Sequence, residues 1–69
     1  MKVSARNVLK GTITEIVKGA TTSHVRIDIG GGAIVTASIT NEAVADLKLE
    51  KVKQAYAVVK ASDVMVGID

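Results

Sequence analysis

The chain has 69 residues and 48% of them are apolar, but Tyr56 is its only aromatic residue and it contains no Cys, Pro, Trp or Phe. The lack of Cys excludes disulfides, thiolate metal sites and thiol nucleophiles, and a single histidine, His24, excludes a site built from several imidazoles. The net charge of +2 makes the chain mildly basic, without the clustered Lys and Arg residues typical of nucleic-acid or membrane-surface binding.

So short a chain makes one small domain, in which the gain from apolar burial and the entropy cost of ordering nearly cancel. Since disulfides and structural metals are excluded, neither can stabilise this small domain. We therefore expect it to bury additional surface between subunits. No apolar run approaches the roughly 20 residues of a membrane span, and residues 1–4 lack the layout of a signal peptide. We therefore expect a cytoplasmic protein with no membrane partner.

Val and Ile dominate the apolar residues, which favours strands over helices. In chain order, residues 7–18 predict a long first strand that begins near Val3, and Gly11 inside it indicates a bend or a close backbone approach. A polar loop follows at residues 19–23. Strict alternation over residues 24–29 then predicts a second strand with one apolar and one polar face.

Three glycines at 30–32 predict a hairpin connection to a third strand over residues 33–39. Thr40 is a predicted N-cap for one short helix over residues 41–46, where Glu42 suits the first turn. The remaining predictions are a strand over 54–60, a single turn over 62–65, and strand-like residues 66–68. This order suggests a small, closed or partly open barrel of the oligonucleotide/oligosaccharide-binding (OB) type.

The sequence gives little support for a catalytic site. His24 lies on the polar face of its strand, where a surface role is favoured over a ligand role, and the carboxylates are scattered among lysines as on a solvated face. Single-strand nucleic-acid binding on a sheet requires exposed aromatic side chains for base stacking, and only Tyr56 is available. We therefore expect neither an enzyme nor a nucleic-acid-binding protein.

Hydrogen-bond donors gather at two predicted strand ends: Ser4, Arg6 and Asn7 at the start of the first strand, and residues 60–62 at the end of the last long one. If these strands are neighbours, Arg6 and Lys60 could converge with the Ser4 hydroxyl to form a donor-rich anion pocket. The alternative is that Arg6 and Lys60 are solubilising charges and that Ser4 and Ser62 are turn residues. The spacing alone leaves both interpretations open.

A resemblance adds to this interpretation. Ser4-Ala5-Arg6-Asn7 with the following Leu9, Gly11 and Ile13, then Ile39-Thr40, and finally Lys60-Ala61-Ser62 closely resemble the molbindin family of small Mop-type molybdate-binding proteins, over nearly the whole chain. The resemblance implies an all-β fold, a small five-stranded OB-like barrel with one short helix, forming a single Mop domain over residues 1–69. It also implies a homo-hexamer, a trimer of dimers, with oxyanions bound between subunits.

The resemblance further implies ligand roles for Ser4, Arg6 and Lys60, and for Thr40 reaching in from a neighbouring subunit. Some relatives have Ser where this chain has Ala43, so a contribution to binding there would come from backbone N–H at the start of the helix. The molybdate-responsive regulators of the family have Pro where this chain has Ser62, which supplies a hydroxyl donor. A second class of site, on the threefold axis, is expected in the loop from Lys18 to Ser23, with the candidate residues Lys18, Gly19, Ala20 and Thr21. Direct metal-cation ligands are not expected.

The expected ligand is molybdate or tungstate, with no catalytic cofactor. Either is a dianion that only accepts hydrogen bonds, which fits a pocket of donors without a carboxylate. The predicted function is therefore intracellular oxyanion binding for molybdenum storage and homeostasis. The alternative from another class is a stand-alone regulatory or nucleic-acid-associated OB-like barrel module.

Overall fold

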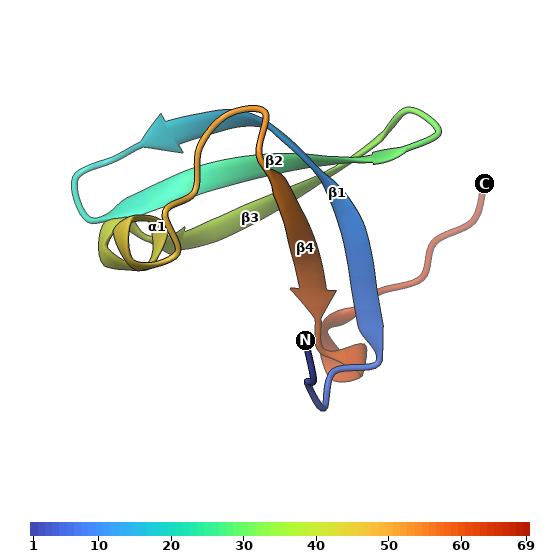
Figure 1. Cartoon of the computed structure of the whole chain (residues 1–69). Coiled ribbons are helices and arrows are strands. Elements are labelled where there is room, and N and C mark those ends of the chain that lie inside the picture. Colours follow the sequence, from blue (N-terminus) through green and yellow to red (C-terminus); the bar gives the residue numbers. More distant parts are fainter.

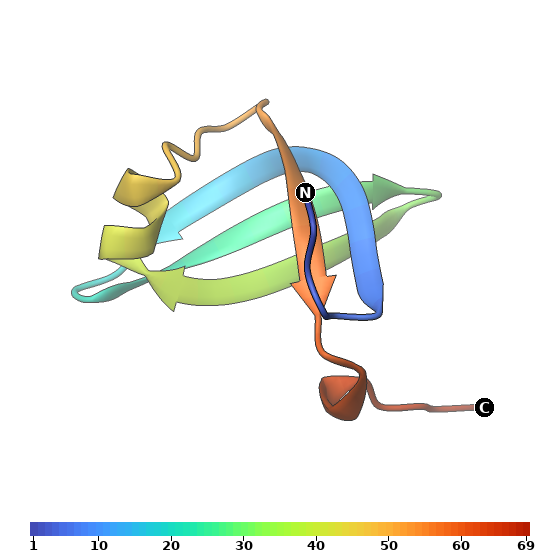
Figure 2. The same cartoon turned by 60° about the horizontal axis from the view of Figure 1, so that its bottom comes forward.

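The computed structural model describes residues 1–69, in which four strands form one curled antiparallel sheet (Figure 1). The strands are β1 (Asn7–Lys18), β2 (Thr22–Gly30), β3 (Ala33–Thr40) and β4 (Gln54–Val59), in the spatial order β3-β2-β1-β4. The long strand β1 serves both halves of the sheet: its first half pairs with β4 and its second half with β2. Figure 2 shows how far β1 bends between these two partners.

The bend in β1 has a local cause. A Cβ atom at Gly11 would lie 2.4 Å from the backbone oxygen of Asp28 and 2.7 Å from a methyl carbon of Ile27, so only glycine allows β2 to pass this closely. A shift of register between Ile13 and Glu15 follows within the same strand, and such bulges increase strand twist. The predicted close approach at Gly11 is confirmed.

The connection between β2 and β3 is the predicted glycine hairpin. Gly30, Gly31 and Gly32 all have positive φ, at 94°, 62° and 83°, a region that residues with a side chain rarely adopt. The strands on either side show the alternation expected of a sheet with one covered face, since Val25 and Ile27 are buried between exposed neighbours.

The helix α1 (Asn41–Asp46) begins and ends at the predicted residues. The Thr40 hydroxyl oxygen accepts a hydrogen bond of 3.0 Å from the Ala43 backbone N–H, which confirms the predicted N-cap. A second helical piece, the 3-10 helix η1 (Ala61–Asp63), follows β4 where a turn was expected. No helix in the structure has the length and apolarity that crossing a membrane requires.

Several boundary predictions are wrong. β2 begins at Thr22, inside the predicted loop, and β4 ends at Val59, one residue before the predicted end. The first strand begins at Asn7 and not near Val3, because its first partner in β4, Val59, lies opposite Asn7. The strand-like residues 66–68 form no strand: the chain after η1 extends away from the sheet in both views, and Val66 and Ile68 are more than nine-tenths exposed. The sheet therefore has four strands where the resemblance implied five.

The hydrophobic core of the chain is small. Only four apolar residues are buried, Ile13, Val25, Ile27 and Ala57, together with one polar residue, Ser23. The concave side of the sheet opens into a groove of about 450 Å³ that is lined almost entirely by apolar side chains from β2, β3, β4 and the segments beside them. A large apolar surface consequently remains uncovered within a single chain.

Candidate functional site

The pairing of β1 with β4 brings the two predicted donor clusters together. Asn7 lies opposite Val59, and its side-chain amide donates to the Val59 carbonyl oxygen over 3.4 Å. The residues just before β1 therefore lie beside the residues just after β4. The latter turn immediately into η1, in which the Asp63 N–H donates to the Lys60 carbonyl oxygen over 2.9 Å. The predicted anion pocket required the first and the last long strand to be neighbours, and β1 and β4 are neighbours.

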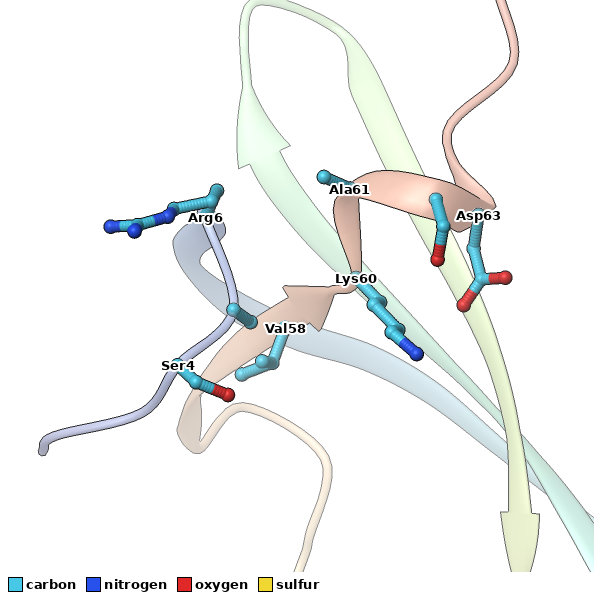
Figure 3. Close-up of a pocket in the computed structure, with 8 residues that line it drawn as sticks. Ser4, Arg6, Val58, Lys60, Ala61 and Asp63 are labelled. Atoms are coloured by element: carbon cyan, nitrogen blue, oxygen red, sulfur yellow. The ribbon is translucent and has the colours of Figure 1, made fainter.

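These two chain segments enclose an open cleft of about 650 Å³. Four of the predicted ligand residues line it, Ser4, Arg6, Lys60 and Ser62, together with Ala5, Val58, Ala61 and Asp63 (Figure 3). None of the four polar side chains makes a hydrogen bond within the chain, and the only ion pair in the structure joins Arg26 to Glu15, remote from the cleft. Two cations and two hydroxyls are thus free to bind a ligand.

The geometry corrects two expectations about this cleft. First, Asp63 lines it, so the cleft is not free of carboxylates; the short turn of η1 brings this residue back beside Lys60. Second, Arg6 and Lys60 do not converge within one chain, because the Arg6 guanidinium extends away from the Lys60 ammonium in Figure 3. A single copy therefore offers its donors on different sides of the cleft.

The predicted ligand Thr40 lies elsewhere. It ends β3 beside α1, whereas η1 lies at a different end of the molecule in both views. Because its oxygen accepts from the Ala43 N–H, its hydroxyl hydrogen is left to donate outward. The same bond engages the Ala43 N–H, the backbone donor expected at this position, within the cap.

The loop between β1 and β2, expected to hold a second oxyanion, is tied to the start of α1. The carbonyl oxygens of Gly19 and Thr21 accept from the side chain and the backbone of Asn41, over 3.0 and 2.9 Å. The buried hydroxyl of Ser23 donates to the Asn41 side-chain oxygen. Neither Asn41 nor Asp63 was among the predicted site residues; the only sequence signal for Asn41 was its place directly after a predicted N-cap.

Comparison with known proteins shows which family the chain belongs to. The TOBE domain family matches residues 3–66, which is almost the whole chain. A probable molybdenum-pterin-binding protein of Haemophilus influenzae is 48% identical over 69 residues and covers all of both chains. The chain belongs to the molbindin family of TOBE-domain proteins.

Two solved structures of molbindin-type proteins share the fold. A molybdate-binding protein from Sporomusa ovata superimposes with a TM-score of 0.90 at 40% identity, covering 99% of this chain and all of that one. The cytoplasmic molybdate-binding protein ModG, with molybdate bound, superimposes with a TM-score of 0.93 at 42% identity. The present chain spans 49% of ModG, so one molbindin unit corresponds to about half of that protein.

In this chain, the cleft beside β1 and β4 is the part of the molecule with unpaired cationic and hydroxyl side chains from both predicted clusters. No cluster of three or more His, Cys, Asp or Glu side chains that could hold a metal cation is present anywhere in the structure, the cleft included. The candidate functional site is therefore the cleft lined by Ser4, Arg6, Lys60 and Ser62.

Proposed function

We propose that this chain is an intracellular, non-enzymatic protein that binds molybdate reversibly for molybdenum storage and homeostasis, as a single domain over residues 1–69. The observation that carries the proposal is the cleft itself, in which Arg6 and Lys60 form no ion pair and line the same cleft as two free hydroxyls. Membership of the molbindin family and the names of its relatives, one of them a cytoplasmic molybdate-binding protein, support the same ligand and compartment.

The chemistry of the ligand fits these side chains. Molybdate is a tetrahedral dianion with four oxygen acceptors, and the guanidinium, ammonium and hydroxyl groups of Arg6, Lys60, Ser4 and Ser62 are all donors. Charge-assisted hydrogen bonds of this kind are each worth about 1.5–3 kcal/mol. Tungstate has the same charge and shape and nearly the same size, so we propose that the cleft binds both with similar affinity.

We further propose that the functional form is a homo-hexamer, a trimer of dimers, in which the open sheet is completed as a closed barrel. The isolated chain exposes 5496 Å², whereas a folded monomer of its mass exposes about 4,100 Å². Its radius of gyration of 12.5 Å also exceeds the value of about 11 Å expected for 69 residues. Both excesses, and the uncovered apolar groove, support burial of this surface against other copies.

The assembly also accounts for the separation of the proposed ligands. Arg6 and Lys60 do not converge in one copy, and Thr40 lies away from the cleft with its hydroxyl hydrogen unused. We propose that Thr40 of a neighbouring copy completes the cleft, and that the loop from Lys18 to Thr21 forms the second class of site on the threefold axis. An oxyanion held between copies would stabilise the assembly, because it binds only the associated form.

Calorimetric titration with molybdate at fixed ionic strength tests the proposal. Arg6→Ala and Lys60→Ala each remove one charge-assisted donor, so each should weaken binding by about 10- to 150-fold while the chain stays folded. Lys10→Ala is the matched control: it removes one positive charge from β1 at an exposed position that does not line the cleft.

Equal losses in Lys10→Ala and in the two cleft variants would refute the assignment of the site. A titration of the wild-type protein with a short single-stranded oligonucleotide distinguishes the alternative function. Binding of the oligonucleotide without binding of molybdate would replace the proposed function with that of a nucleic-acid-associated barrel module.

A further inference from the structure

Asn41 makes more hydrogen bonds to the loop before β2 than any other side chain in the structure. Its side-chain N–H donates to the Gly19 carbonyl oxygen over 3.0 Å, and its side-chain oxygen accepts from the Ser23 hydroxyl. Its backbone N–H donates to the Thr21 carbonyl oxygen over 2.9 Å. One residue at the start of α1 therefore holds two positions of the loop, Gly19 and Thr21, and one residue of β2, Ser23, all 18 to 22 residues earlier in the chain.

The loop has no comparable support of its own. Its one internal backbone bond joins the Gly19 N–H to the Thr22 carbonyl oxygen, over 2.8 Å, and its residues from Gly19 to Thr22 are exposed. By contrast, Ser23 is only 2% exposed and is the single buried polar residue of the chain. A buried hydroxyl without a partner would cost about 1–3 kcal/mol, so the bond from Ser23 fixes the Asn41 side chain in place.

The direction of these bonds determines what the loop offers to a ligand. All peptide bonds in the chain are trans, so the carbonyl of one residue and the N–H of the next point in opposite directions. Because the Gly19 carbonyl points towards Asn41, the N–H of Ala20 points away from it. Asn41 thus turns a backbone acceptor inward and a backbone donor outward, which is the orientation that an anion requires.

The same residue follows Thr40 directly. Thr40 lies opposite Thr22 in the pairing of β2 with β3, and its cap bond to Ala43 spans Asn41. Thr40 and the loop are therefore connected both through the end of the sheet and through the Asn41 side chain. Movement of the loop relative to the start of α1 would break the hydrogen bonds made by Asn41.

We propose that Asn41 is a positioning residue that holds Thr40 and the loop Lys18–Thr21 in one fixed arrangement, so that both oxyanion-binding elements depend on it without its touching the ligand. This inference rests on the function proposed above. It predicts that loss of Asn41 weakens molybdate binding at both classes of site together, whereas loss of a ligand residue weakens one class.

The test combines two measurements on Asn41→Ala. Residue-resolved amide hydrogen exchange of the ligand-free protein should show faster exchange at Gly19, since the loop loses its support. Calorimetry with molybdate should show about a 5- to 150-fold loss of affinity, as expected from the loss of two neutral hydrogen bonds. Ser23→Ala removes only one of these bonds and should give a smaller loss.

Val35→Ala is the control for stability alone. Val35 packs against the core from the middle of β3 and belongs to neither binding element, so its truncation should destabilise the protein yet change molybdate affinity less than about twofold. Unchanged exchange at Gly19 in Asn41→Ala, or faster exchange with unchanged molybdate affinity, would overturn the inference. If the wild-type protein itself does not bind molybdate, the proposed function fails first, and the inference fails with it.

Discussion

At the scale of single residues, the charges around the cleft determine how strongly it attracts a dianion. Arg6 and Lys60 attract it, and Asp63 opposes it from the same cleft. No ion pair within 4.0 Å links Asp63 to either cation, so its charge acts on the ligand without being neutralised by a direct partner. The cleft is therefore weaker as an anion site than its two cations alone would make it.

Replacing Asp63 tests this balance. Asp63→Asn removes one negative charge and keeps the shape, so molybdate affinity should rise by about two- to fivefold at low salt, and the gain should shrink as ionic strength increases. Asp28→Asn makes the same change in net charge at the β2–β3 hairpin, where the amide oxygen can still accept from the Gly30 N–H. An equal gain in molybdate affinity in both variants would show that the affinity depends only on the net charge of the protein and not on the position of Asp63.

Asp63 also affects how well the cleft can reject phosphate. Near neutral pH phosphate carries a proton that needs an acceptor, and a cleft of donors alone would reject it. With Asp63 in the cleft an acceptor is present, so rejection of phosphate does not follow from the donor set.

Gly11 determines how closely β1 and β2 approach. Gly11→Ala would force a Cβ against the Asp28 backbone oxygen, which cannot move without disturbing the sheet, so we expect a loss of about 1–3 kcal/mol in unfolding free energy. Gly67→Ala adds the same methyl group where no atom lies within 4 Å, and should change stability by less than about 0.5 kcal/mol. Urea unfolding of both variants measures the difference; equal stabilities would mean that the sheet adjusts at Gly11.

Individual site residues were predictable where they follow a motif. Ser4, Arg6, Lys60 and Ser62 were predicted and do line one cleft, because strand pairing brings the ends of β1 and β4 together. Asp63 was not predicted, since its position depends on the turn of η1.

Among the structural elements, the helix α1 shows how one side chain can serve both stability and binding. Thr40 caps the helix through its oxygen and, in the proposed function, donates its hydroxyl hydrogen to the oxyanion of a neighbouring copy. The two roles use different atoms of the hydroxyl group, so substitutions can separate them.

Thr40→Asp keeps a good cap but replaces the donor with a negative charge, so stability should stay within about 0.5 kcal/mol while molybdate binding falls at least tenfold. Thr40→Ala loses both roles, including about 1 kcal/mol of stability from the cap. Thr40→Ser keeps both and is the control. Thermal unfolding and calorimetry on the three variants check this; normal binding by Thr40→Asp would remove Thr40 from the site.

Most elements could be predicted from local patterns. The bounds of α1 follow from its cap, and the β2–β3 hairpin follows from three glycines that adopt positive φ. The predicted strand at residues 66–68 failed because the residue pattern indicates only a tendency to extend, and a strand also requires a partner edge. The connection through Asn41 could not be predicted, since it depends on a loop and a helix meeting in space.

At the scale of the whole molecule, the proposed hexamer follows from surface that one chain cannot cover. Light scattering at micromolar concentration with molybdate present should give about 43 kDa, six times the 7.2 kDa chain. Because the oxyanion is proposed to bind between copies, removing it by dialysis should weaken the assembly. A well-folded species of 7.2 kDa in the presence of molybdate would contradict the shared site.

The central claim is that an oxyanion binds in the cleft lined by Ser4, Arg6, Lys60 and Ser62. Crystals of the protein grown with tungstate, with diffraction data collected at a tungsten absorption edge, test it most directly, because the anomalous signal locates the metal atom without assumptions about its ligands. We predict a tungsten peak in this cleft, with its oxygens in hydrogen-bond contact with the Lys60 ammonium and the Ser4 hydroxyl, and with Thr40 of a neighbouring copy beside it. Tungsten peaks only elsewhere, with this cleft empty at saturating tungstate, would contradict the claim.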